Sequence, residues 1–290
     1  MSWVAFFGVF AMPQCALTSA GVSDSPGRVF DVQIDERAWV LADDIRWYSA
    51  SRSVSVVFVD GPETFPCGKR ILDHDANAFS TIFFGDVCDK PTVLVWIRDV
   101  GSAEMRRFIS HHEAFHAVPQ SLGVTSRRAV AGTGLNPVDA SVTSSQAIVS
   151  FWDALLSQNS DHSGGRYCEV VARRFNELSP GEKIYVDYIS HVEWPAEYYA
   201  MLVMGWSDIS DDYVELRRRL ETPRGYLLAY PALSAVEAVR GRMHWQRQYQ
   251  MGEPMLNTYL TSRSCAPLVV AGDTRRPNRL APILVPGLVE

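Results

Sequence analysis

Residues 102–118 read SAEMRRFISHHEAFHAV, and this stretch decides the expected fold. It contains neither Gly nor Pro, and its apolar residues recur three and four positions apart, as on one face of a helix. Ser102 is a good N-cap residue, and Pro119 follows directly after the stretch. We therefore predict a single helix that begins after Ser102 and ends before Pro119. The residues that carry the pattern are Met105, Phe108, Ile109 and His112.

Two histidines on this helix have the spacing of metal ligands. His112 and His116 are four residues apart, so their rings project from the same face, one turn from each other. Two imidazole nitrogens in this arrangement can share one tetrahedral Zn²⁺. Glu113 is turned about 100° around the helix axis from His112. Its carboxylate would then lie beside a water molecule bound to the zinc. Zinc lowers the pKa of this water to about 7, and the carboxylate could accept a proton from the water.

The segment before this helix has the pattern of β-strands. Three runs are rich in β-branched and aromatic residues, and turn residues separate them. Gly85-Asp86 is expected to stop the second run. Three strands so closely spaced predict a small mixed or antiparallel sheet. The runs cover residues 54–59, 79–84 and 92–97.

The segment after the helix is predicted to be a loop over residues 120–140 and then largely helical. The whole chain is therefore expected to be an α+β protein with a small N-terminal β-sheet, a central helix and a helical C-terminal lobe. We expect one domain over residues 28–290, with an N-lobe over about 28–118 and a C-lobe over about 119–290. The expected helices cover residues 143–158, 166–178, 195–205, 211–221 and 232–250.

The charge of the chain argues against a nucleic-acid partner. The 290 residues carry a formal net charge of −6, and no cluster combines basic with aromatic residues. The densest basic run is Arg217-Arg218-Arg219, which we interpret as the solvated face of a helix. No nucleic acid is therefore expected among the partners.

The N-terminus has the pattern of a secretory signal peptide. Residues 3–12 are apolar but too few to span a bilayer, and Thr18-Ser19-Ala20 offers small residues for cleavage. No Lys or Arg occurs before Arg28, which departs from the usual leader. We predict a signal peptide over residues 1–20, secretion or export to a periplasm, and no stable membrane span. The alternative is a cytoplasmic protein with a buried N-terminal element.

The cysteines favour the exported alternative. Removal of residues 1–20 would leave Cys67, Cys88, Cys168 and Cys265, with no CxxC pair among them. Four cysteines allow three pairings. We favour Cys67–Cys88 within the strand-rich segment and Cys168–Cys265 across the C-terminal half. Four isolated buried thiols are the alternative.

A third metal ligand is expected in the stretch EWPAEYYA, residues 193–200. Pro195 suits the first turn of a helix, which would place Glu197 on that helix and Glu193 before it. We therefore prefer Glu197 as the ligand. Glu193 is the alternative, with Glu197 four residues later as the carboxylate that supports a ligand. Both could also be an ordinary acidic helix start.

These motifs resemble the zincin metallopeptidases. Pro119 and Leu122 stand where a metzincin requires Gly and His, so that branch is excluded. A stretch near Asn136 faintly resembles the aspzincins but has Asn where the ligand Asp belongs. His112-Glu113-x-x-His116 followed by Ala-Glu-Tyr-Tyr-Ala is similar to the gluzincin branch, in particular to the anthrax lethal factor-like families. The resemblance covers only about residues 108–118 and 188–201.

The resemblance implies a zinc metallopeptidase that acts on a peptide or protein substrate. One Zn²⁺ would be held by His112, His116 and Glu197, with Glu113 as general base. Tyr188, or alternatively His191, would donate a hydrogen bond to the developing oxyanion. Thermolysin-like gluzincins carry an Asp four residues after the ligand Glu, where this chain has Met201.

Two other functions are consistent with the sequence. The chain could be a zincin-fold binding or effector protein that has lost catalysis. It could also be a helix-rich structural domain without a metal, in which case chelation would leave its stability unchanged.

Overall fold

A computed structural model describes residues 29–40, 53–59, 63–64, 70–71, 82–87, 90–95, 102–117, 145–156, 164–206, 211–219 and 224–268. Its strands are β1 (Val29–Gln33), β2 (Ser53–Phe58), β3 (Glu63–Thr64), β4 (Arg70–Ile71), β5 (Ile82–Val87) and β6 (Lys90–Val95). A four-stranded mixed sheet has the order β1-β2-β6-β5, in which β2 and β6 are parallel and the outer pairs are antiparallel. Strands β3 and β4 form a separate antiparallel pair.

The predicted strands agree with the structure except at one end of the sheet. Strands β2 and β6 lie within two residues of their predicted bounds. Strand β5 runs through Gly85 and Asp86, which were expected to stop it, and these residues pair with Thr92 and Pro91 of β6. The cross-strand pairing outweighs the local turn tendency, because a strand partner satisfies the backbone groups. Strand β1 was not singled out by its sequence.

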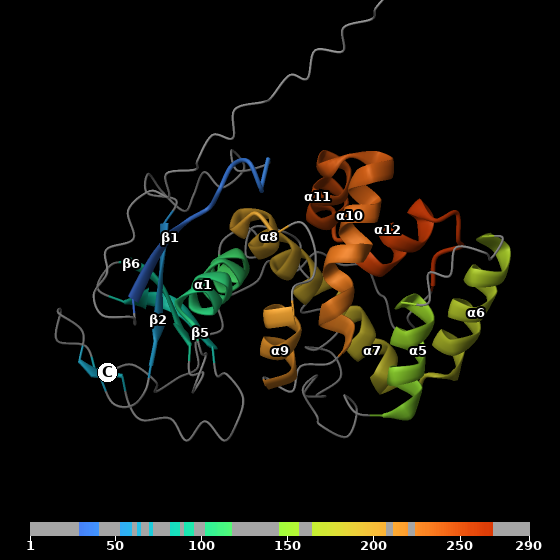
Figure 1. Ribbon diagram of the computed structural model, residues 1–290, viewed down its shortest axis with the longest axis horizontal. Helices are drawn as coiled ribbons and strands as arrows, with labels where there is room; N and C mark the ends of the chain where they lie inside the picture. Colours follow the sequence, from blue (N-terminus) through green and yellow to red (C-terminus); the bar gives the residue numbers. More distant parts are fainter. Residues whose placement is uncertain are drawn as a thin grey trace, which may run out of the picture.

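The central helix is confirmed as α1 (Ala103–Ala117). The Ser102 hydroxyl accepts a hydrogen bond from the backbone N–H of Met105 at 3.2 Å, as expected of an N-cap. One face of α1 packs on strands β1, β2 and β6. Phe108 and Phe115 of the same helix are fully buried against aromatic side chains of the C-terminal part, such as Tyr213 and Tyr199. The sheet therefore lies on one side of α1 and leaves the other side for the C-terminal helices (Figure 1).

All the secondary-structure elements described in the C-terminal part are helices, so the α+β class holds. Two helices were missed in the sequence, α7 and α12 below. The predicted helix 232–250 is two helices, because Gly241 has φ +81° and separates them. The helices are α5 (Gln146–Leu156), α6 (Gly164–Glu177), α7 (Pro180–Tyr188), the π-helical turn η2 (Ile189–Glu193), α8 (Trp194–Met204), α9 (Asp211–Arg219), the 3₁₀ helix η3 (Arg224–Leu228), α10 (Ala229–Arg240), α11 (Arg242–Gln250) and α12 (Met255–Ser262).

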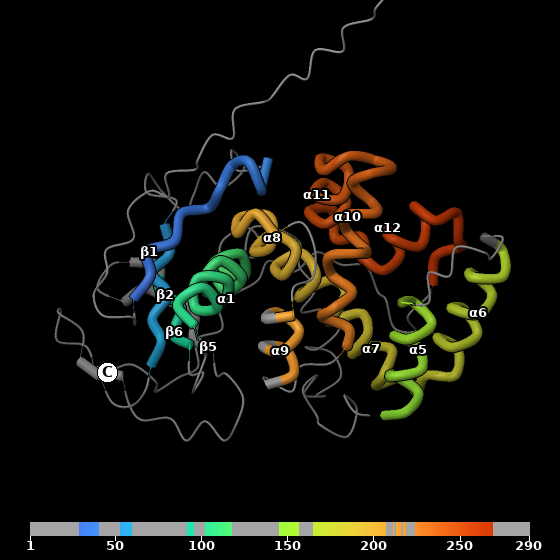
Figure 2. Tube along the Cα trace, viewed as in Figure 1, coloured from blue at the N-terminus to red at the C-terminus, as the bar shows by residue number. Residues whose placement is uncertain are grey.

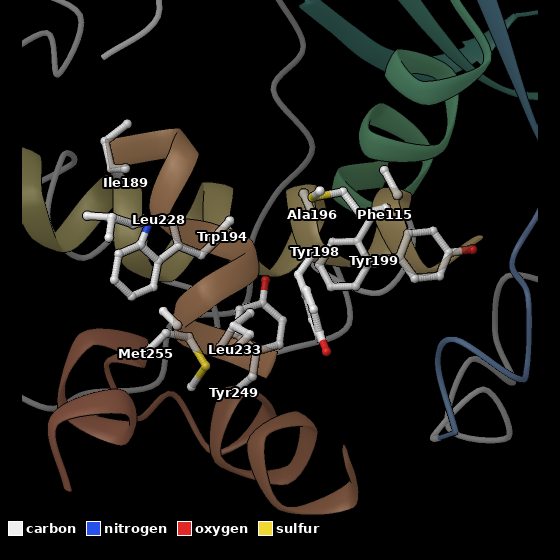
Figure 3. Close-up of a cluster of buried hydrophobic side chains, with 14 of the residues drawn as sticks. Phe115, Ile189, Trp194, Ala196, Tyr198, Tyr199, Leu228, Leu233, Tyr249 and Met255 are labelled. Carbon is white, nitrogen blue, oxygen red and sulfur yellow. The ribbon is translucent and has the colours of Figure 1, made fainter. Parts of the chain in front are cut away.

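Helix α8 lies at the centre of the molecule, beside α1 and in contact with α10 (Figure 2). All its residues from 194 to 201 are buried, which is typical of a helix enclosed on every side. Around it, aromatic side chains from several helices form much of the core (Figure 3). Phe115 of α1, for example, lies 5.2 Å from Tyr199 of α8 and 5.9 Å from Tyr249 of α11, measured between ring centroids. This shared core fixes α1 and α8 against each other.

One predicted disulfide is present. Cys168 of α6 and Cys265, after α12, form a disulfide bond with a sequence separation of 97 residues. The predicted pair Cys67–Cys88 and the predicted signal peptide lie outside the described residues. Among the helices that the structure describes, none combines the length and apolar character needed to cross a membrane.

Candidate metal centre

Three side chains from α1 and the π-helical turn η2 converge where the two elements meet. Helix α1 contributes His112 and His116, and the π-helical turn η2 contributes Glu193. One ligand atom of each lies within 4.8 Å of the others. The group could therefore hold a metal ion.

The distances between these atoms suit a tetrahedral ion. The two histidine Nε2 atoms lie 2.9 Å apart. Glu193 Oε2 lies 3.2 Å from Nε2 of His112 and 3.5 Å from Nε2 of His116. Ligands about 2.0–2.1 Å from a tetrahedral zinc would be roughly 3.3 Å from one another. The three atoms thus form a triangle of the right size, and the residues present fit such an ion.

Glu193, and not the preferred Glu197, is the carboxylate that meets both histidines. The preference rested on Pro195 as the start of a helix, but the chain is helical from Pro180 to Met204 through α7, η2 and α8. The proline is accommodated inside this run because the preceding turn widens into a π-helix, with the Trp194 N–H bonded to the Ile189 carbonyl. Glu193 therefore lies on the helix, in the widened turn, and faces α1.

Glu197 lies one turn further along and contacts the other nitrogen of the first histidine. Its Oε2 is 2.7 Å from Nδ1 of His112, and its side chain is 0% exposed. A carboxylate at the far nitrogen of a ligand histidine fixes the ring orientation and raises its basicity. The second interpretation of the sequence, with Glu193 as the ligand and Glu197 as the supporting carboxylate, matches this geometry.

The electrostatics of the site favour a cation between the histidines and the carboxylates. Burial disfavours protonation of His112, but Glu193 and Glu197 outweigh it and raise its pKa from 6.5 to about 10. Burial likewise disfavours the charged form of Glu193, yet the two histidines hold the pKa of its carboxyl well below the ordinary range. The same carboxylates that stabilise an imidazolium would stabilise a metal ion at Nε2.

Glu113 lies beside this triangle without being part of it. Its Oε1 is 4.0 Å from Nε2 of His112. Its Oε2 is buried, and among the described residues it has no hydrogen-bond partner. Burial raises the pKa of Glu113, while the neighbouring histidines oppose the rise. A buried carboxylate oxygen without a protein partner, next to a metal site, is suited to bind a water molecule or a substrate.

The two candidate oxyanion donors lie in different surroundings. Burial, followed by the nearby Glu193 carboxylate and the charge of Glu113, raises the pKa of Tyr188 well above the ordinary value. Its phenol therefore stays protonated next to the triangle. His191 is buried with its ring centroid 5.1 Å from that of Tyr249, in the hydrophobic core. The structure thus brings Tyr188 next to Glu193 and packs the His191 ring beside Tyr249.

The surroundings of one residue near the site were misread from the sequence. Arg217 was expected on a solvated face, but it is 6% exposed and forms a two-point pair with Glu197. Arg218, the next residue, keeps the expected exposure, with 73% of its side chain accessible. A signal was present, because Tyr213 and Arg217 are four residues apart and share one face of α9. Both contact Glu197.

Comparison of the chain with protein-family models, with curated proteins and with solved structures finds no match.

Proposed function

We propose that the protein is a zinc-dependent metallopeptidase in which His112, His116 and Glu193 hold one Zn²⁺. The observation that supports the proposal most directly is the convergence of three ligand atoms at 2.9–3.5 Å from one another, with the Glu113 carboxylate beside them. The triangle provides three protein ligands, as catalytic zinc sites do, and leaves a fourth position for water or substrate. Peptide as the substrate rests on the resemblance to the gluzincins.

Each residue has a defined role in this proposal. When bound, a zinc ion would supply Lewis-acid chemistry, lowering the pKa of a water molecule and polarising a carbonyl. Glu113 accepts the proton of the attacking water and passes it to the leaving amine nitrogen. The Tyr188 hydroxyl donates a hydrogen bond to the oxygen of the carbonyl under attack. Glu197 holds the ring of His112 so that Nε2 faces the ion.

We also propose that the protein is exported to an oxidising compartment. The disulfide between Cys168 and Cys265 supports this, because such bonds persist outside the reducing cytosol. The leader pattern over residues 1–20 points in the same direction.

The test combines a metal assay with one substitution. The purified full chain is expected to contain about one zinc per molecule by elemental mass spectrometry, and to cleave members of a mixed peptide library. Glu113→Gln should retain the zinc and lower kcat by about 10²–10⁴-fold, since the base is lost and the ligands remain.

Glu104→Gln is the matched control, because Glu104 is on the same helix but exposed in its first turn. Full activity of Glu113→Gln, or a wild-type protein that binds no zinc, would sink the proposed mechanism. A zinc-loaded wild type that cleaves no peptide would instead favour the binding or effector protein.

A further inference from the structure

Arg217 is a buried arginine that reaches the metal centre through one intervening residue, Glu197. It comes from α9, whereas the carboxylate it meets, Glu197, comes from α8. Its Nε donates to Glu197 Oε1 at 2.6 Å, and its Nη2 donates to Oε2. The same Oε2 lies 2.7 Å from Nδ1 of His112. The chain of contacts therefore runs from Arg217 through Glu197 to a metal-binding histidine.

Aromatic side chains enclose the guanidinium. The Arg217 Cζ lies 4.6 Å from the ring centroid of Tyr226, 5.5 Å from that of Tyr213 and 5.7 Å from that of Phe108. Trp206 stacks on Phe108, with 5.0 Å between centroids and 9° between the ring planes. Rings at these distances attract a cation through their quadrupoles. The enclosure leaves the planar fork of Arg217 facing Glu197.

A third donor completes the surroundings of Glu197. The Tyr213 hydroxyl donates to Oε1, the oxygen that also accepts from Nε of Arg217. With His112 and Arg217 at Oε2, each carboxylate oxygen meets two partners. A carboxylate held by a planar two-point fork has far less freedom to turn than one held at a single point.

We propose that Arg217 is a positioning residue of the metal centre. By holding both oxygens of Glu197, it fixes the carboxylate that orients His112, so that Nε2 of that histidine points at Glu193 and His116. The inference rests on the proposed metal site and extends it to a residue that does not touch the ion. A buried ion pair contributes little net stability compared with apolar residues, so stability alone is a weak reason for this arrangement.

Cobalt binding tests the proposal, because Co²⁺ reports both affinity and ligand geometry. In the full chain freed of metal by chelation, Co²⁺ is titrated against a competing chelator and its visible absorption is recorded. Arg217→Lys retains the charge but not the fork, and should bind Co²⁺ about 10-fold more weakly with an altered spectrum. Arg217→Met should lose about 100-fold. The expected order of affinity is wild type, then Lys, then Met.

Arg218→Lys is the matched control, since Arg218 neighbours Arg217 on α9 but is exposed and paired with Glu215. Its affinity and spectrum should equal those of wild type. Far-UV circular dichroism of the metal-free variants checks that they fold. If Arg217→Met does not fold, Tyr213→Phe replaces it; it removes one donor to Glu197 but keeps the ring, and a weakening of a few fold is expected.

The outcomes separate the two proposals. A wild type that binds Co²⁺, together with a folded Arg217→Lys of equal affinity and spectrum, overturns the role of Arg217 and leaves the metal site standing. A wild type that binds metal but cleaves no peptide overturns the peptidase, while the order of affinities still supports Arg217. A wild type that binds neither Zn²⁺ nor Co²⁺ overturns both.

Discussion

Glu193 and Glu197 lie four residues apart and contact different nitrogens of the same imidazole. Glu193 meets Nε2 of His112, which faces His116, and Glu197 meets Nδ1 on the far side of the ring. Two chemically identical side chains thus have different surroundings, because each reaches a different nitrogen. Only the one at Nε2 can share an ion with both histidines.

Substitution of each glutamate by glutamine should separate these roles. Glu193→Gln removes a charged ligand and should abolish measurable zinc binding, whereas Glu197→Gln should weaken it by about 10–100-fold. Zinc affinity is measured by competition with a chromophoric chelator. If Glu197→Gln lost the metal while Glu193→Gln kept it, the ligand assignment would be reversed.

His111, on the same helix as His112, should make the stability of the fold depend on pH. Burial, followed by the charge of Arg107, lowers its pKa from 6.5 to about 4. The unfolded chain therefore binds this proton at a higher pH than the folded chain, so stability is complete above about pH 6.5 and falls as the pH drops towards 4. In metal-free protein, His111→Gln should gain about 1–2 kcal/mol relative to wild type between pH 7.5 and pH 5. Urea unfolding at both pH values measures this, and parallel losses in the two proteins would contradict it.

At the scale of elements, the π-helical turn is the feature that builds the site. Helices α7 and α8 form one continuous helical run, and η2 widens it where Glu193 faces α1. The short helix η3 packs against this turn and against α5. Its Gly225 carbonyl accepts a 2.7 Å hydrogen bond from the indole of Trp194, the first residue of α8.

Gly225 is required at this contact because a side chain would not fit. A Cβ there would lie 2.8 Å from the indole of Trp152 and 2.9 Å from Cγ2 of Ile189, both buried. Gly225→Ala should therefore lower the free energy of unfolding by about 1–3 kcal/mol, measured by denaturant titration. Gly165→Ala is the control: a Cβ at Gly165 in α6 meets no atom within 4 Å, so the change should be neutral or slightly stabilising. Equal stabilities of the two variants would contradict the packing argument.

At the scale of the molecule, the disulfide closes most of the C-terminal helices into one loop. Cys168 and Cys265 are separated by 97 residues, and η2, α8 and α9 lie between them. A crosslink over such a span restricts the unfolded chain strongly. Helix α6, which carries one end, lies far from α1 in the molecule (Figure 1).

Replacement of both cysteines should therefore affect stability and not metal binding. Cys168→Ser combined with Cys265→Ser is expected to lower the free energy of unfolding by about 2–4 kcal/mol, measured in guanidinium. Zinc affinity below the unfolding transition should stay within about twofold of wild type. An unchanged denaturation midpoint would show that the crosslink does not restrict the unfolded state.

The sequence by itself determined the features that depend on spacing within one helix or on the residue pattern of one strand. The positions of His112, Glu113 and His116 on one helix follow from their spacing, because the geometry of a helical turn is local. The N-cap Ser102 and two central strands follow from patterns of a few residues for the same reason. The paired Cys168 and Cys265 were favoured from their count and place in the chain.

Only the tertiary structure decided which carboxylate meets the histidines and which arginine is buried. Pro195 signals a helix start locally. Only the packing of the continuous run α7–η2–α8 selects the π-helical turn, in which Glu193 faces α1. Arg217 and Arg218 are neighbours in the same basic run, yet Arg217 is buried and Arg218 is exposed. They differ because one face of α9 packs towards Glu197 of α8. The pair of histidines was readable from the helix. The third member of the triangle and the support behind it depend on contacts between elements, which spacing along a single helix does not determine.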